Sequence, residues 1–204
     1  MNIVCLDVEG VLVPEIWISV SEATGIKELR LTTRDEPDYN KLMRRRIAIL
    51  DEHGLKLADI QKVIAGMQPL EGAAAFVETL RERTQLILLS DTFEQFAQPL
   101  MRKLGWPTLF CNTLIVDAEG RVTGYKLRQE NGKKHAVAGL ANMGFTVSAA
   151  GDSYNDVAML QTAARGFFFR PPEGIAKQFP EIPIAETYPE LLALLFPLEK
   201  QPAI

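Results

Sequence analysis

The stretch Ile3-Val4-Cys5-Leu6-Asp7-Val8-Glu9-Gly10 decides the fold. Its first residues form an apolar run typical of a buried strand, the run ends on a carboxylate, and a glycine turn follows. Strands that are apolar throughout belong to parallel sheets covered on both faces, and open α/β sheets bind ligands at the carboxyl edge of their strands. Asp7 is therefore the first candidate for a nucleophile or a metal ligand.

Strand and helix patterns alternate along most of the chain, which favours an α/β fold. Helical patterns alone fill the segment after the first strand, and a polar loop with Gly120 between two alternating runs predicts a β-hairpin. We expect a doubly wound, Rossmann-like parallel sheet, with a small helical cap inserted after the first strand and a β-hairpin excursion. The core would comprise residues 1–14 and 71–204, and the cap residues 15–70. Strands are expected over 2–7, 86–90, 111–116, 122–127, 145–150 and 166–169, and helices over 15–24, 38–53, 57–66, 71–83, 93–104, 133–143, 155–164 and 188–196.

The composition excludes several classes of function. The 204-residue chain is 47% hydrophobic with a net charge of −4, so it carries no basic footprint for nucleic acid. No apolar stretch is long enough for a membrane span, and the N-terminus lacks the basic region of a signal peptide, so we expect a cytoplasmic protein. Cys5 and Cys111 are expected to be buried free thiols. Trp17 and Trp106 are expected to be packing residues rather than substrate platforms.

Polar residues follow three of the expected strands. They are Asp7, then Ser90-Asp91, then Gly151-Asp152 with Asn155-Asp156 just beyond. Because the carboxyl ends of parallel strands share one edge, these groups can converge. Several carboxylates at one point repel one another unless a cation is present, and hard oxygen ligands suit Mg²⁺. A lysine would complete a phosphate site, and either Lys133 or Lys134 leads a helix just before the third of these strands.

Each of these residues has a plainer explanation when it is taken alone. A single Asp at a strand end is usually a turn or cap residue. The segment Ser90-Asp91-Thr92 could simply cap the helix expected at 93, and Asn155-Asp156 could simply begin a helix. All of them together, in this order and each at a strand end, favour a catalytic site.

The segments Asp7-Val8-Glu9-Gly10-Val11, Ser90 at a strand end, Lys133, and Gly151-Asp152-Ser153-Tyr154-Asn155-Asp156 resemble the four motifs of the haloacid dehalogenase-like superfamily. The resemblance spans nearly the whole chain. Within the superfamily, the phosphoserine phosphatase branch is most similar, in particular its bacterial members with phosphoserine:homoserine phosphotransferase activity. It implies a Mg²⁺-dependent enzyme that takes phosphate from L-phosphoserine to water, with homoserine as a further acceptor. We expect a monomer or a homodimer, a choice that the sequence does not fix.

The resemblance also implies a role for each motif residue. Asp7 would attack phosphorus, and Glu9 would be the general acid and base. Glu15 would pair with the substrate ammonium and Arg46 with its carboxylate, while Tyr39, two helical turns before Arg46, would face the same cleft. Mg²⁺ would be held by Asp7, the backbone carbonyl of Glu9, Asp152 and Asp156. The phosphate would be held or oriented by Ser90, Asp91, Lys133 and Asn155.

Glu9 departs from the superfamily pattern, which usually has Asp two positions after the nucleophile. Glu9 keeps the carboxyl group on a side chain that is one methylene longer than that of Asp. We expect that this different position of the carboxyl group leaves room in the site for an alcohol acceptor.

Other functions remain open from the residues alone. A phosphatase for another small ester, such as a sugar phosphate, would not need Arg46 and Glu15 to face the cleft. A receiver-type signalling domain would carry its acceptor Asp on a later strand, and a dinucleotide-binding module would need a glycine-rich fingerprint after the first strand.

Overall fold

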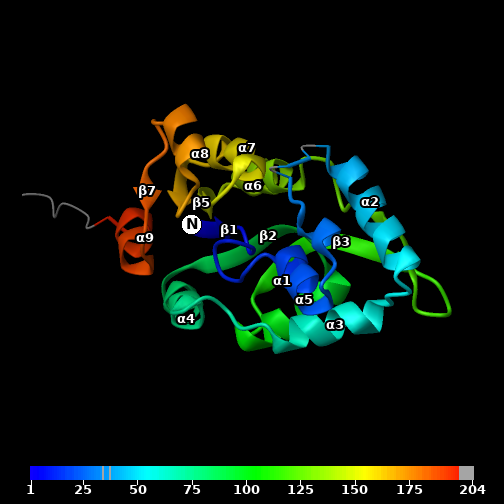
Figure 1. Cartoon of the computed structure of the whole chain (residues 1–204). Coiled ribbons are helices and arrows are strands. Elements are labelled where there is room, and N and C mark those ends of the chain that lie inside the picture. Colours follow the sequence, from blue (N-terminus) through cyan, green and yellow to red (C-terminus); the bar gives the residue numbers. More distant parts are fainter. Residues whose placement is uncertain (34, 37, 198–204) are drawn as a thin grey trace, which may run out of the picture.

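A parallel sheet forms the centre of the molecule (Figure 1), seen in a computed structural model that describes residues 1–33, 35–36 and 38–197. Within these residues the strand order is β4-β3-β2-β1-β5-β6-β7, and every neighbouring pair is parallel except β3 with β4. The first strand therefore lies in the middle, with its successors on both sides. The strands are β1 (Asn2–Leu6), β2 (Gln85–Phe93), β3 (Thr108–Val116), β4 (Val122–Lys126), β5 (Thr146–Gly151), β6 (Arg165–Phe169) and β7 (Ile184–Ala185).

Helices cover both faces of the sheet. One face is covered by α6 and α7, and the other by α4, α5 and α9. Successive side chains of β1 point to opposite faces of the sheet. Val4 and Leu6 pack in the apolar cluster on one face, and Ile3 and Cys5 pack in the cluster on the other. The helices of the core are α4 (Ala73–Arg83), α5 (Glu94–Lys103), α6 (Gly132–Asn142), α7 (Tyr154–Thr162), α8 (Glu173–Gln178) and α9 (Tyr188–Leu195).

The segment between β1 and α4 is helical throughout its regular elements. It contains α1 (Ile16–Thr24), the 3₁₀ helix η1 (Lys27–Arg30), α2 (Tyr39–Glu52) and α3 (Leu57–Gly66). Helix α2 begins at an Asp38 cap, whose carboxylate accepts a hydrogen bond from the Lys41 N–H at 3.0 Å. Its buried face follows the helical period through Leu42, Met43, Arg46, Ile49 and Leu50, which is why Arg46 points inward.

Several hydrogen bonds fasten this helical segment to the sheet and its helices. The Gln61 side-chain amide donates to the Gln95 carbonyl at 2.9 Å, and the Lys103 ammonium donates to the Ala65 carbonyl at 2.9 Å. The Leu57 N–H donates to the Gly120 carbonyl at the tip of the β3–β4 hairpin, also at 2.9 Å. We use the word cap for residues 15–70. The division into a cap and a core of residues 1–14 and 71–204 stays a prediction, and residues 198–204 lie outside the described part.

The predicted fold class is confirmed: the sheet is doubly wound and the hairpin forms around Asp117–Gly120. Three short elements were not expected, namely η1, α8 and β7, because they are too short to show a period. The expectation that both tryptophans are packing residues does not fit Trp106, since 57% of its surface is exposed, whereas Trp17 is buried. Both cysteines are free, Cys5 buried and Cys111 half-buried.

In the described part of the chain, no helix combines the length and the apolar character that crossing a membrane requires. The cytoplasmic location stays a prediction.

Candidate active site

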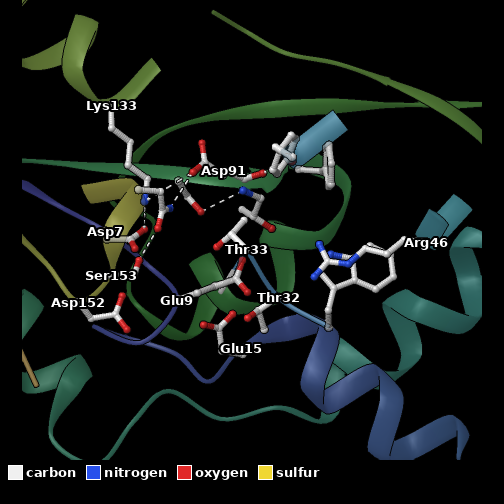
Figure 2. Close-up of a pocket in the computed structure, with 16 residues that line it drawn as sticks. Asp7, Glu9, Glu15, Thr32, Thr33, Arg46, Asp91, Lys133, Asp152 and Ser153 are labelled. Atoms are coloured by element: carbon white, nitrogen blue, oxygen red, sulfur yellow. Dashed lines mark hydrogen bonds and ion pairs between the residues drawn. The ribbon is translucent and has the colours of Figure 1, made fainter. Parts of the chain in front are cut away.

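The Lys133 ammonium lies at the centre of a group of carboxylates at the carboxyl edge of the sheet (Figure 2). Its Nζ is 2.8 Å from an Asp7 oxygen and 2.7 Å from an Asp156 oxygen, and 3.9 Å from Asp91. Asp7 follows β1, and Lys133 stands in the first turn of α6. The sequence left Lys133 and Lys134 as alternatives; Lys133 is buried among the carboxylates, whereas Lys134 is exposed.

Burial and mutual repulsion set the charge state of this group. Burial, followed by the charge of Asp156, raises the pKa of Asp7 well above its usual value, and Lys133 opposes the rise. Burial alone would lower the pKa of Lys133, but the charges of Asp156 and Asp7 outweigh it and raise that pKa well above normal. Lys133 therefore remains a fixed positive charge beside the candidate nucleophile.

Asp156 organises the loop that carries Asp152. One of its oxygens accepts the Asp152 N–H at 3.0 Å and the Ser153 N–H at 3.1 Å, and the other accepts Lys133. Ser153 caps α7 in a reciprocal capping box with Asp156. Asp156 is fully buried and does not line the pocket, so it lies behind the site.

The donor set fits a hard divalent cation. Asp7, Asp152 and Asp156 each offer a carboxylate oxygen, all within 4.8 Å of one another. In the described part of the chain, Lys133 is the one ammonium that pairs with this group, through Asp7 and Asp156. Oxygen ligands with excess negative charge are typical of Mg²⁺ sites. Gly10 allows this approach, because it has a φ of +78° and a Cβ there would lie 2.3 Å from an Asp152 oxygen.

The residues after Leu89 leave the β2–β3 ladder. Leu89 pairs with Phe110 and Phe93 pairs with Asn112, so Ser90, Asp91 and Thr92 lie opposite the single residue Cys111 and form a bulge. We call these three residues the bulge loop. Inside it, the Thr92 N–H donates to the Ser90 hydroxyl at 3.1 Å. The Asp91 carboxylate accepts the Asn155 amide at 2.9 Å.

Glu9 faces the cap. Its carboxylate accepts the Ile16 N–H at the start of α1 at 2.8 Å. Burial, followed by the negative charge of Glu15, raises the pKa of Glu9 to about 8. At neutral pH its carboxyl therefore holds a proton that it can donate, which suits a general acid. Glu15 lines the same pocket.

Arg46 closes the far wall of the pocket, opposite Asp7 and Lys133 (Figure 2). Its guanidinium lies 4.6 Å from the centre of the Trp17 ring and donates to the Leu31 carbonyl at 2.7 Å. Burial lowers the pKa of Arg46 to about 10, so it stays charged at neutral pH. Among the described residues, its buried Nε has no hydrogen-bond partner. A buried donor without a partner is energetically unfavourable. Because Arg46 lines the pocket, a ligand that offers this N–H an acceptor would remove that cost.

Tyr39 reaches from the cap to the bulge loop. Its hydroxyl donates to the backbone carbonyl of Asp91 at 2.9 Å, and burial raises the pKa of this phenol above its usual value. The sequence placed Tyr39 in the cleft as a substrate contact; the ring does line the pocket, but the hydroxyl is bound to the protein.

The structure brings nearly all the predicted site residues into one pocket, with Asp156 just behind it. The pocket residues that were predicted are Asp7, Glu9, Glu15, Tyr39, Arg46, Ser90, Asp91, Lys133, Asp152 and Asn155. Those that sequence reasoning missed are Trp17, Thr32, Thr33, Thr92, Phe93 and Ser153. Trp17 was expected only to pack; its position two residues after Glu15 was the one available signal. Thr32 and Thr33 lie in an irregular loop, where no period predicts which side chains face the site.

The fold and the site define a haloacid dehalogenase-like hydrolase. The model of that family matches residues 23–161, and the chain belongs to this family. It is an enzyme of the phosphatase class, so the receiver-type and dinucleotide-binding alternatives are set aside.

Individual relatives are similar over most of their length. The chain is 56% identical to phosphoserine phosphatase ThrH of Pseudomonas aeruginosa, over 94% of this chain and 93% of that protein. It is 55% identical to a phosphoserine phosphatase of Pseudomonas syringae pv. tomato, over 94% of this chain and 81% of that one. The crystal structure of a phosphoserine phosphatase in its apo form shares the fold, with a TM-score of 0.76 at 23% identity over 95% of this chain and 97% of the other.

Proposed function

We propose that this enzyme hydrolyses L-phosphoserine to L-serine through an aspartyl-phosphate on Asp7. One observation carries the proposal: the pocket has a carboxylate nucleophile beside Lys133 at one end and a buried Arg46 with an unpartnered Nε at the other. A substrate with phosphate at one end and a carboxylate at the other fits this arrangement. A sugar phosphate would leave Arg46 unpaired. The names of the two Pseudomonas relatives support the same substrate.

The first step makes the enzyme-bound intermediate. An Asp7 oxygen forms a bond to phosphorus as the bond from phosphorus to the serine oxygen breaks. Glu9 gives its proton to the departing oxygen, so serine leaves as a neutral alcohol. Lys133 holds positive charge next to the transferring group. Ser90 and the Asp91 N–H hold phosphate oxygens, and Asn155 orients the group.

The second step regenerates Asp7. Glu9, now ionised, takes a proton from water as the water oxygen bonds to phosphorus and the Asp7–phosphorus bond breaks. At the other end of the pocket, Arg46 holds the substrate carboxylate and Glu15 its ammonium.

Asp7, Asp152 and the backbone carbonyl of Glu9 would hold Mg²⁺. When bound, the ion supplies positive charge that stabilises the phosphoryl oxygens. Both oxygens of Asp156 already accept hydrogen bonds from protein groups, so we expect Asp156 to hold waters of the ion while it orients Lys133.

We further propose that homoserine can replace water in the second step. Its hydroxyl would give its proton to Glu9 and its oxygen would bond to phosphorus, while Arg46 and Glu15 hold its amino-acid end as they hold that of serine. The ThrH name of one relative supports a threonine-related acceptor. The oligomeric state, monomer or homodimer, stays a prediction.

The direct test is phosphate release from L-phosphoserine with Mg²⁺ or with EDTA, each with and without homoserine. We expect release only with Mg²⁺, and phosphohomoserine when homoserine is added. Turnover of a generic phosphate ester without turnover of phosphoserine would contradict the assignment of phosphoserine as the substrate. Release without phosphohomoserine would overturn the transfer alone.

Gly10→Ala is expected to raise the Mg²⁺ concentration for half-maximal activity about 10- to 100-fold, the range typical of lost support around a metal ligand. The added Cβ would clash with Asp152 and displace a metal-binding carboxylate. Gly25→Ala is the matched control, because Gly25 also has a positive φ of +75°, but a Cβ added there would meet nothing within 4 Å in the described part of the chain. A Mg²⁺ titration of both variants checks this. Equal shifts would show that backbone strain, rather than contact with Asp152, is responsible.

Arg46→Ala is expected to lower kcat/KM for L-phosphoserine by about 10²-fold or more, because a charge-assisted pair with the substrate carboxylate is lost. Activity on p-nitrophenyl phosphate, which has no such carboxylate, should change far less. Arg45→Ala on the exposed side of α2 is the control and should leave both activities unchanged. Similar losses on the two substrates would contradict the carboxylate role of Arg46.

A further inference from the structure

The bulge loop lies outside the regular pairing of β2 with β3. It lies where β2 and β3 lose register, and within the described residues Ser90, Asp91 and Thr92 have no register partner on β3. Yet this loop must present the Ser90 hydroxyl and the Asp91 N–H to a phosphate group in a fixed geometry. The position of the Asp91 peptide is therefore set by the side chains that bind it.

Two side chains from different parts of the chain donate to the Asp91 carbonyl. The Asn112 amide, on β3, donates at 3.1 Å, and its own oxygen accepts the Arg128 N–H at 3.0 Å. Asn112 is buried, so this is a fixed contact within the core. The Tyr39 hydroxyl, on the cap helix α2, donates to the same carbonyl at 2.9 Å. One anchor thus belongs to the sheet and the other to the cap.

Other hydrogen bonds between the cap and the core do not reach the bulge loop. Gln61 and Lys103 join α3 to α5, and the Tyr125 hydroxyl of β4 donates to Asn40, the residue next to Tyr39. Tyr39 and Tyr125 also pack edge to face, with ring centres 5.9 Å apart. The two tyrosines therefore hold the same turn of α2, but Tyr39 alone of the pair binds the bulge loop.

We propose that Tyr39 is a positioning residue that completes the phosphate-binding geometry of the bulge loop through the Asp91 carbonyl, and that its hydroxyl does not contact the amino-acid part of the substrate. The cap thereby contributes to phosphate binding as well as to recognition of the amino-acid end. This inference rests on the proposed function in one respect: the bulge loop holds the phosphate.

The test is Tyr39→Phe, measured on L-phosphoserine, on p-nitrophenyl phosphate and by competitive inhibition with inorganic phosphate. We expect kcat/KM to fall by roughly two- to tenfold on both substrates and the inhibition constant of phosphate to rise by a similar factor, which is the effect of one hydrogen bond. Tyr125→Phe is the matched control. It also removes a phenol hydroxyl from this turn of α2, but that hydroxyl donates to Asn40 and not to Asp91. It should change none of the three values.

Each contrary result identifies a different error. A loss on phosphoserine with p-nitrophenyl phosphate spared would show that Tyr39 contacts the amino-acid end directly. Equal losses in Tyr39→Phe and Tyr125→Phe would show that the hydroxyl acts only by docking the cap. No change in Tyr39→Phe would also overturn the proposal. Because two of the three readouts do not use phosphoserine, a wrong substrate assignment would be seen separately, as failure of the wild-type enzyme on phosphoserine.

Discussion

Asp7→Asn is expected to reduce turnover of L-phosphoserine by about 10⁴-fold or more, the size of effect seen when a covalent nucleophile is removed. The carboxamide oxygen is a poor nucleophile and cannot form the aspartyl-phosphate. The replacement has the same shape, so its oxygen can still accept the Val8 N–H that Asp7 accepts at 2.7 Å. Phosphate release with saturating Mg²⁺ measures the effect.

The control for Asp7→Asn is a measurement of its melting temperature, which shows whether the variant is folded. Burial and Asp156 raise the pKa of Asp7, which means that the ionised carboxylate is disfavoured in the folded state. Neutralising it should therefore leave the melting temperature in EDTA no lower than that of the wild-type protein. A folded variant whose turnover stays within about tenfold of wild type would contradict the assignment of the nucleophile.

Lys133→Met is expected to lower the free energy of unfolding by about 3–5 kcal/mol in EDTA and to abolish activity. The ammonium is buried and lies within 2.8 Å of two carboxylates, so its removal leaves Asp7 and Asp156 without a compensating positive charge. Urea denaturation measures the loss of stability. Mg²⁺ should restore part of it, because the ion supplies positive charge at the same place.

The pH dependence of this variant follows from the same charges. Without Lys133, which opposes the rise, the folded-state pKa of Asp7 should lie further above its unfolded value. Such groups favour folding at low pH and disfavour it as pH rises through the folded-state pKa, so the difference from wild type should narrow as pH is lowered. Lys134→Met is the matched control, and as an exposed neighbour it should cost under about 0.5 kcal/mol. Equal costs for the two variants would contradict the central position of Lys133.

Periodicity and strand ends predicted much of the site. Asp7, Ser90 and Asp152 follow strands that share an edge, and the helical spacing from Tyr39 to Arg46 turns both toward the pocket. These residues could be assigned to one site because local patterns place each of them at a strand end or on one helix face, and the sheet topology then brings those positions together.

Contacts between segments distant in the sequence could not be predicted in this way. Trp17 of α1 stacks on Arg46 of α2. Tyr39 and Asn112, which lie before and after Asp91 in the sequence, both donate to the Asp91 carbonyl. Nothing in the local sequence indicates these partners, because they depend on how the cap sits on the sheet. The two-residue strand β7 likewise forms only because β6 is there to pair with it.

The most direct test of the account is to quench the enzyme with acid during turnover of L-phosphoserine and locate the phosphoryl group by peptide mass spectrometry. We expect one phosphoryl group on the peptide that contains Asp7, and none on that peptide in Asp7→Asn. Turnover of phosphoserine with the Asp7 peptide unmodified, or with the phosphoryl group on another residue, would contradict the mechanism.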